Sequence, residues 1–159
     1  MTTFYIREEG AYREANSGDV IQRAQHLMRQ RFRFGSPVLG EPALTREFLS
    51  LHLADRDSEV FGVLHLNNRN RLIAAEDLFH GTINAAFVHG REVVRSVLKH
   101  NTARIICYHN HPSGDVNPSE LDLMTTRQLK TALALVDVML IDHLIIGDGV
   151  YSFAEHGLL

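Results

Sequence analysis

Two histidines stand two positions apart in the segment HNHPSGDVNPSELD, which runs from His109 to Asp122. The residues that lead into this segment, ARIICYHNH, form a continuous apolar run of the kind seen in buried strands. Successive side chains of a strand point to opposite faces, so His109 and His111 would share one face at the end of the strand. Pro112 cannot continue a central strand, and we expect the strand to end before it.

A helix is predicted to begin a few residues later. Ser119 has the type and position of a helix N-cap, and Asp122 would lie in the first helical turn. A strand end and a helix start can converge on one point, where two imidazoles and a carboxylate would supply three protein ligands for zinc. The fourth position would remain for water, as in catalytic zinc sites, and a base would be needed to accept a proton from that water.

Both halves of this pattern also have a simpler interpretation. An isolated H-x-H is a weak indication of a metal site, and Ser119 with Asp122 forms a capping box of the acidic kind, which alone would explain both residues. The two interpretations are compatible, because a cap fixes the start of the helix that aims the ligand. The complete string H-x-H-P-x6-S-x2-D is what favours the metal site.

That complete string resembles the signature of the JAMM/MPN metalloproteases, also called JAB domains. The resemblance implies three zinc ligands, His109, His111 and Asp122, and a role for Ser119 in stabilising the oxyanion of a tetrahedral intermediate. The family also has a catalytic glutamate in an upstream E-x-x-G pattern at the start of a strand. The segment EVFG matches this pattern, so the resemblance implies that Glu59 is the base. Taken alone, Glu59 would be interpreted as a solvated acid at the start of a strand.

Several further segments, GTIN, HGREV, DHLIIG and SFAEHGLL, together with HNHPSG, resemble the RadC-like branch of this family, in its short single-domain form. The resemblance covers residues 44–159 and implies a mixed β-sheet with flanking helices, layered as in JAB/MPN and cytidine-deaminase-like folds. Longer RadC-like proteins have an N-terminal helix-hairpin-helix region, and residues 1–43 contain no clear motif of that kind. The branch name also implies DNA repair, which we treat as a historical label.

The apolar patterns predict the same α/β class independently. Residues 1–16 are polar and mixed, which indicates a loose arm or an edge strand, and helices are predicted over 19–33 and 44–53. Two apolar runs around NRNR predict a hairpin, HGREVVRSVLKHN predicts a helix, and the last two strands should flank GDG. We therefore expect an α/β domain over 44–159 preceded by a partly helical extension over 1–43.

The helix after the motif, PSELDLMTTRQLKTALALVD, should bury one face. The apolar positions that roughly share this face are Leu121, Met124, Leu129, Leu133 and Val136.

Three other residues near the motif have ordinary interpretations. Cys107 precedes His109 by two positions, and a buried inert thiol is favoured over a fourth ligand or a nucleophile. His143 lies within an apolar run, where a hydrogen-bonded core histidine is expected. Asp115 follows Gly114 and is expected to form a turn.

Arginines alternate with aromatic residues in the segment MRQRFRFG. Arg29, Arg31 and Arg33 beside two phenylalanines could form a basic stacking patch for single-stranded nucleic acid. The same pattern is typical of an amphipathic helix with a solvated basic face.

Composition excludes several classes of protein. The 159 residues suit one domain, and the net charge of −3 gives no overall electrostatic attraction to nucleic acid. A single cysteine cannot form an internal disulfide, so a reducing cytoplasm is the simplest compartment. No apolar run approaches the roughly 20 residues of a membrane span, and the N-terminus lacks the pattern of a signal peptide.

Two functional hypotheses follow. The first is a zinc-dependent hydrolase of JAMM type, with one zinc per chain, in which a metal-activated water attacks a peptide or isopeptide carbonyl of a peptide or protein substrate. The alternative is a nucleic-acid-associated module, linked to DNA repair, whose metal site is structural or vestigial and which binds through Arg29, Arg31 and Arg33. A metalloenzyme acting on nucleic acid is a weaker third possibility.

Overall fold

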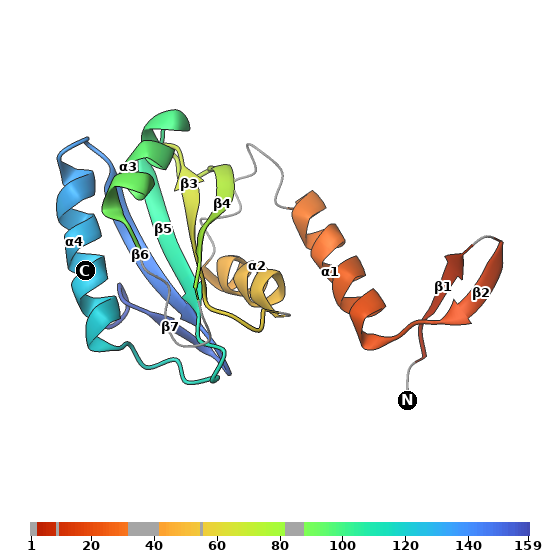
Figure 1. The fold of residues 1–159 in the computed structure, drawn as a ribbon. Coiled ribbons are helices and arrows are strands. Elements are labelled where there is room, and N and C mark those ends of the chain that lie inside the picture. Colours follow the sequence, from red (N-terminus) through yellow and green to blue (C-terminus); the bar gives the residue numbers. More distant parts are fainter. Residues whose placement is uncertain (1–2, 9, 32–41, 55, 82–87) are drawn as a thin grey trace.

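The structure is a computed structural model that describes residues 3–8, 10–31, 42–54, 56–81 and 88–159. A small hairpin and a helix at the N-terminus extend away from the rest of the molecule, which is a mixed sheet with helices on both faces (Figure 1). The predicted α/β class, a mixed β-sheet with flanking helices, is confirmed.

The described part of the main sheet has five strands in the order β4-β3-β5-β6-β7. Their bounds are β3 Val60–Leu66, β4 Leu72–His80, β5 Arg104–Asn110, β6 Met139–Ile146 and β7 Val150–Ser152. The central pair β5–β6 is parallel, and the other pairs are antiparallel. The hairpin predicted around NRNR is β3–β4, and the strands predicted around GDG are β6 and β7.

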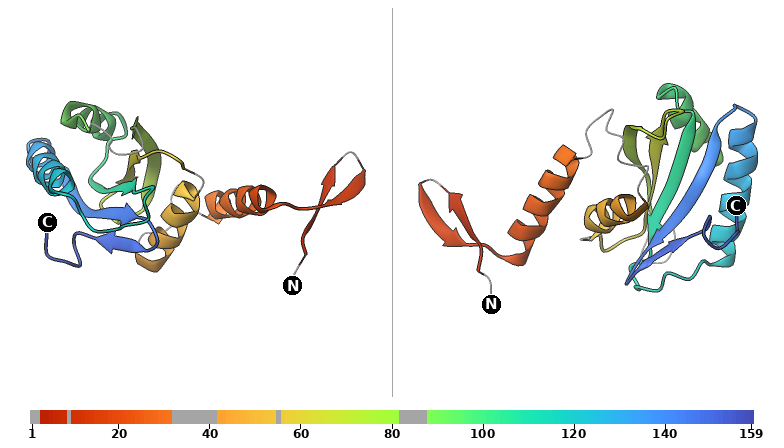
Figure 2. Two further views of the ribbon diagram at one scale, coloured as in Figure 1. Left: turned by 60° about the horizontal axis from the view of Figure 1, so that its bottom comes forward. Right: turned by 180° about the vertical axis from the view of Figure 1, so that it is seen from behind.

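Helices cover the sheet on both faces (Figure 2). One face packs against α2 (Pro42–Leu53), whose Phe48 and Leu49 are buried with residues of β3, β5 and β6. The other face packs against α3 (Gly90–Lys99) and α4 (Glu120–Ala134). Because α4 connects the parallel strands β5 and β6, its start lies beside the end of β5, as a β-α-β crossover requires.

The buried face of α4 differs from the prediction at its first turns. Leu121 and Met124 are 42% and 50% exposed, although both were predicted to be buried. The side chains that face the sheet lie on one helical stripe, Asp122, Thr126, Leu129 and Leu133. The prediction was wrong because the stripe begins with two polar residues, which an apolar periodicity cannot detect.

Residues 3–31 form elements that the prediction described only in part. The strands β1 (Tyr5–Glu8) and β2 (Ala11–Glu14) pair as an antiparallel hairpin, and α1 (Ser17–Arg31) follows. Most hairpin side chains are exposed on both faces, so no alternation of apolar residues marks the strands in the sequence.

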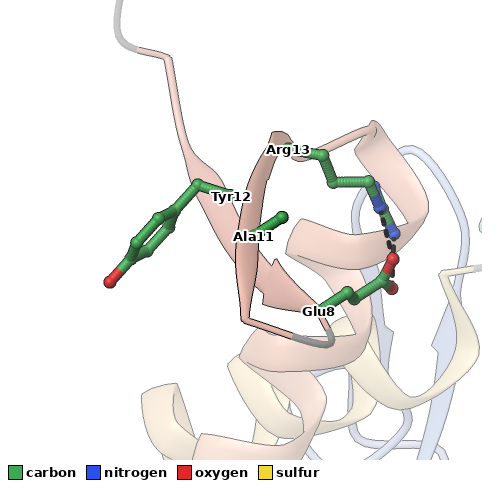
Figure 3. Close-up of a pocket in the computed structure, with 4 residues that line it drawn as sticks. All are labelled: Glu8, Ala11, Tyr12 and Arg13. Carbon is green, nitrogen blue, oxygen red and sulfur yellow. Dashed lines mark hydrogen bonds and ion pairs between the residues drawn. The ribbon is translucent and has the colours of Figure 1, made fainter.

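An arginine joins this hairpin to the following helix. The guanidinium of Arg13 donates to Glu8 across the hairpin and to Asp19 in the first turn of α1. Figure 3 shows Arg13 and Glu8 beside Ala11 around a surface hollow, with the ring of Tyr12 pointing away from the ion pair. Gln25 on α1 donates to the carbonyl of Leu51, which attaches α1 to α2.

No described helix has both the length and the apolar composition needed to cross a membrane. The boundary predicted between residues 1–43 and 44–159 stays a prediction.

Candidate metal centre

The two histidines of the H-x-H pattern lie together at the end of β5, as predicted. His109 is buried within the strand, and His111 follows its last residue, where its backbone N–H donates to the carbonyl of Ile146 on β6. Their Nε2 atoms are 3.1 Å apart. The alternation of side chains along the strand has therefore aimed both rings at one point.

The start of α4 brings a carboxylate to the same point. Ser119 is the N-cap, and its hydroxyl oxygen accepts from the backbone N–H of Asp122 at 3.1 Å. The Asp122 side chain accepts in return from the backbone N–H of Ser119, so the predicted capping box is confirmed. This cap directs Asp122 Oδ1 to 3.2 Å from His109 Nε2 and Asp122 Oδ2 to 3.6 Å from His111 Nε2. We call His109, His111 and Asp122 the strand-end cluster.

A backbone carbonyl fixes the orientation of one imidazole of the strand-end cluster. The Nδ1 atom of His111 is 2.6 Å from the carbonyl oxygen of Asp115. Because a carbonyl only accepts, Nδ1 must bear the hydrogen, and Nε2 of the neutral ring then presents a lone pair to the other members of the cluster.

A buried chain of hydrogen bonds orients the second imidazole. Thr126 Oγ1 donates to the carbonyl oxygen of Asp122, so it must accept from His143 Nδ1, which is 2.7 Å away. Burial holds the pKa of His143 well below its usual range, and the ring is therefore neutral. Its Nε2 then accepts from His109 Nδ1 at 2.8 Å, which leaves the Nε2 lone pair of His109 facing Asp122.

The chemistry of this donor set fits a metal ion. Two imidazole lone pairs and a carboxylate converge with their ligand atoms within 4.8 Å of one another. Three acceptors in such proximity require a cation or a proton between them, and two nitrogens with one carboxylate oxygen suit zinc. Each ring also has a hydrogen-bond acceptor at its other nitrogen, as metal-binding histidines ordinarily have.

The protonation states agree with a cation-binding site. Burial opposes ionisation of Asp122, but its close contacts with the imidazoles of His109 and His111 and the hydrogen bond from Ser119 outweigh it and hold the pKa of this carboxyl below its usual range. The hydrogen bond with Asp122 is also the main reason why the pKa of His111 is raised. The cluster thus attracts positive charge, which a proton supplies when no metal is bound.

Glu59 lies immediately before β3, beside the cluster. The antiparallel pairing of Phe61 with His109 brings the start of β3 next to the end of β5. Asn110 strengthens this junction, because its side chain accepts from the backbone N–H of Val60 and donates to the carbonyl of Ser58. The charge of Glu59 contributes to the raised pKa of His111, after the larger effect of Asp122. Its role as a base stays a prediction.

The glycine of the E-x-x-G pattern has a packing role on the opposite face of the sheet. A Cβ atom at Gly62 would lie 2.2 Å from Cζ of Tyr108, its partner across β3 and β5. The hydroxyl of Tyr108 donates to Asp77 Oδ1 at 2.7 Å, which keeps the ring in this position. Gly62 therefore lets the two strands approach with the tyrosine lying between α2 and the sheet.

Two other features of the sequence do not contribute to the strand-end cluster as described: Cys107 and the arginine segment. Cys107 is a free, fully buried thiol in the apolar layer under α3 and α4, and burial raises its pKa, which agrees with an inert side chain. Arg33 lies outside the described residues, as do the side chains of Arg29 and Arg31, so the basic patch stays a prediction.

Sequence reasoning missed the residues that orient the ligands. His143 was expected in the core, and it is buried there, but its partner is His109. No signal in the sequence joins the two residues, because their contact depends on the parallel register that sets His143 opposite Cys107, on the face that also presents His109. Nothing in the sequence indicated that the carbonyl of Asp115 would orient His111.

The chain is similar to known proteins over most of its length. The profile of the RadC-like JAB domain matches residues 39–158. A UPF0758 protein from Thioalkalivibrio sulfidiphilus is 54% identical over 122 residues, which are 77% of this chain and 55% of the relative. The UPF0758 protein YeeS from Escherichia coli K12 is 48% identical over 141 residues, which are 88% of this chain and 95% of the relative.

The chain spans little more than half the length of several of the curated relatives that it matches, including one from Stenotrophomonas maltophilia of which 60% is covered. The match nevertheless includes β3, β5 and the start of α4, the elements that position the strand-end cluster. The chain belongs to the RadC-like JAB domain family.

Proposed function

We propose that this protein is a zinc-dependent hydrolase of JAMM type that cleaves a peptide or isopeptide bond. The observation that supports the proposal is the convergence of two imidazole lone pairs and a carboxylate within 4.8 Å of one another. In this reading His109, His111 and Asp122 would hold the metal. A bound zinc ion would lower the pKa of a water molecule to about 7 and polarise the carbonyl oxygen of the substrate.

Glu59 is the residue proposed to transfer the proton. Its carboxylate accepts a proton from the attacking water and returns it to the nitrogen of the leaving amine. Two features support this role. The residue stands next to β3 at the point where that strand meets the end of β5, and its charge acts on His111. General acid–base transfer of this kind contributes about 10²- to 10⁴-fold to a rate.

Ser119 is proposed to stabilise the oxyanion, a role that requires its hydroxyl to turn. In the structure the hydroxyl donates to Asp122 Oδ2 at 2.6 Å, and a serine has only one hydrogen to donate. Ser119 is exposed, so the hydroxyl has room to rotate toward a substrate while its oxygen continues to cap the helix.

The test combines metal analysis with hydrolysis of defined probes. The full chain, loaded with zinc, is assayed against a library of internally quenched peptides and against peptides joined through a lysine isopeptide bond. We expect cleavage of at least one probe class, lost on chelation and restored by zinc. Glu59→Gln should retain the metal and lose about 10²- to 10⁴-fold in rate.

The matched control for this variant is Asp57→Asn, which removes an exposed carboxylate two positions earlier. It should hydrolyse the same probe at the wild-type rate. If Glu59→Gln also hydrolyses it at the wild-type rate, Glu59 is not the base. If the wild-type chain binds no zinc at the strand-end cluster, the hydrolase proposal itself fails.

A further inference from the structure

A second group of potential metal ligands lies at the other end of β3. It consists of His65 on β3, Glu76 on β4 and His100, which caps the C-terminus of α3. His100 Nε2 is 2.8 Å from Glu76 Oε1, and His65 Nε2 is 3.7 Å from Glu76 Oε2. We call these three residues the α3 cluster. All three ligand atoms lie within 4.8 Å of one another, as in the strand-end cluster.

The buried member of this group faces the carboxylate. His65 is fully buried, and its Nδ1 is 2.8 Å from the hydroxyl of Thr102. That contact orients the ring so that Nε2 faces Glu76 and Ser96. Ser96 donates its single hydrogen to Glu76, so its oxygen accepts from His65 Nε2. A metal would bind after this hydrogen moves to Nδ1, where the hydroxyl of Thr102 can accept it. Burial lowers the pKa of His65 to about 4, so the ring is neutral at neutral pH, which is the form that binds metals.

The carboxylate between the two imidazoles is ionised. Burial raises the pKa of Glu76, but hydrogen bonds from Ser96, His100 and Lys99 outweigh this effect and lower it to about 2. Two imidazoles and one carboxylate are a donor set that zinc accepts, with a fourth position open to water.

We propose that His65, Glu76 and His100 form a second zinc site, separate from the strand-end cluster. The site joins β3, β4 and the end of α3, so a bound ion would stabilise the packing of the helix on the sheet. A surface hollow that Glu76, Ser96 and Lys99 help to line opens onto Glu76 and provides a route of entry. The inference does not depend on the proposed hydrolase activity.

Lys99 competes with the ion for the same carboxylate. Its ammonium group is 3.0 Å from Glu76 Oε1, and it therefore compensates the negative charge when the site holds no metal. The Lys99 side chain is 66% exposed and can withdraw into solvent at little cost. Removal of Lys99 should therefore strengthen zinc binding. If Glu76 served only as the ion-pair partner of Lys99 and bound no metal, the same change would not affect zinc binding.

The experiment counts zinc ions per folded full-length chain by elemental analysis after dialysis against a zinc buffer. We expect about two ions in the wild type, and about one in each of Asp122→Asn, Glu76→Gln and His100→Ala. Combining Asp122→Asn with Glu76→Gln should leave none. Glu76→Gln is included because it keeps the shape of the side chain if His100→Ala fails to fold.

A titration against a chelator then tests the role of Lys99. In the Asp122→Asn background, Lys99→Met should tighten the remaining site by about 10-fold, and Arg95→Met, an exposed neighbour on α3, should not change it. Zinc content that is unaffected by both Glu76→Gln and His100→Ala overturns the second site. A zinc content that falls in those two variants but is the same in Asp122→Asn as in the wild type supports the second site and contradicts the hydrolase proposal instead.

Discussion

The strand-end cluster and the α3 cluster each present two histidines and one carboxylate on the same face of the sheet. They differ in what holds the imidazoles. In the strand-end cluster His111 is fixed by a carbonyl, which can only accept a hydrogen. In the α3 cluster His65 is fixed by the hydroxyl of Thr102, which can accept or donate. The strand-end cluster is therefore committed to presenting lone pairs, whereas in the α3 cluster His65 Nε2 donates to Ser96, so this ring must change tautomer before it binds a metal.

The two regions also differ in how they balance charge. The carboxylate of Asp122 faces only imidazoles and its own helix cap, whereas that of Glu76 already pairs with the ammonium group of Lys99. Ligand identity alone thus does not determine affinity for a metal. The partners of the ligands determine how much must be rearranged before the ion binds.

This difference predicts unequal affinities in the wild-type protein, the largest of the expected effects. A titration with zinc chelators of graded strength should remove zinc in two steps, with the α3 cluster emptied first and the affinities separated by about 100-fold. The variant Asp122→Asn identifies the tighter step by abolishing it. If zinc left the strand-end cluster first, the partners that fix the imidazole tautomers would not determine zinc affinity in this protein.

Disruption of the hydrogen-bond chain behind His109 should reduce the difference between the two clusters. His143→Phe removes the acceptor of His109 Nδ1, and we expect a 10- to 100-fold weaker zinc affinity at the strand-end cluster only. Thr126→Val should act in the same direction, because it leaves His143 Nδ1 without its acceptor.

The conservative variant Thr126→Ser keeps the hydroxyl and provides the control. It should bind zinc with nearly wild-type affinity. If His143→Phe and Thr126→Val both bind zinc as the wild type does, the orientation of His109 is set by strand packing alone.

A smaller effect is expected where α4 begins. Ser119→Ala removes the oxygen that accepts from the Asp122 backbone, which should lower the free energy of unfolding by about 1 kcal/mol. It also removes the hydroxyl that donates to Asp122 Oδ2, which leaves the carboxylate held by the backbone N–H alone, so zinc affinity should fall at the strand-end cluster and not at the α3 cluster. Urea denaturation of the metal-free proteins measures the first effect. Unchanged stability would mean that the capping box contributes nothing.

The smallest expected effect is the loss of stability at the α3 cluster when the pH is lowered. The pKa of Glu76 is lowered from 4.5 to about 2, so its contribution to stability is complete above pH 4.5 and is lost as the pH falls toward 2. The carboxylate is partly exposed, and solvent screening limits this contribution to on the order of 0.5 kcal/mol. Urea midpoints of metal-free wild type and Glu76→Gln, compared over this range, should converge as the pH falls. Parallel curves would contradict the assigned ion pairs.

Local patterns in the sequence predicted that the three candidate ligands lie together, but they did not predict the surroundings of these residues. His109 and His111 follow from the alternation along one strand, and Ser119 with Asp122 follows from helix capping. His143 could not be assigned to His109, because their contact depends on the register of two parallel strands joined through α4. The inward stripe of α4 was assigned wrongly because Asp122 occupies a position where the apolar pattern expects a hydrophobic residue.

The α3 cluster illustrates the same limit more strongly. His65, Glu76 and His100 come from three elements and share no spacing in the sequence that indicates a common site. The N-terminal hairpin was only partly anticipated for a different reason. Its strands have no buried face, so the alternation that identifies a strand is missing. The two strands are linked instead by the ion pair between Arg13 and Glu8.

The pairing of β3 with β5 also has a consequence for the order of folding. Val60 and Asn110 are 50 positions apart in the chain, yet the hydrogen bond between them stands beside both Glu59 and His111. A slip of one residue in this register would turn the side chains of β3 to the opposite face. The proposed base can therefore reach the candidate metal ligands only after this long-range pairing is complete, so we expect a bound zinc ion to slow unfolding while leaving the refolding rate almost unchanged.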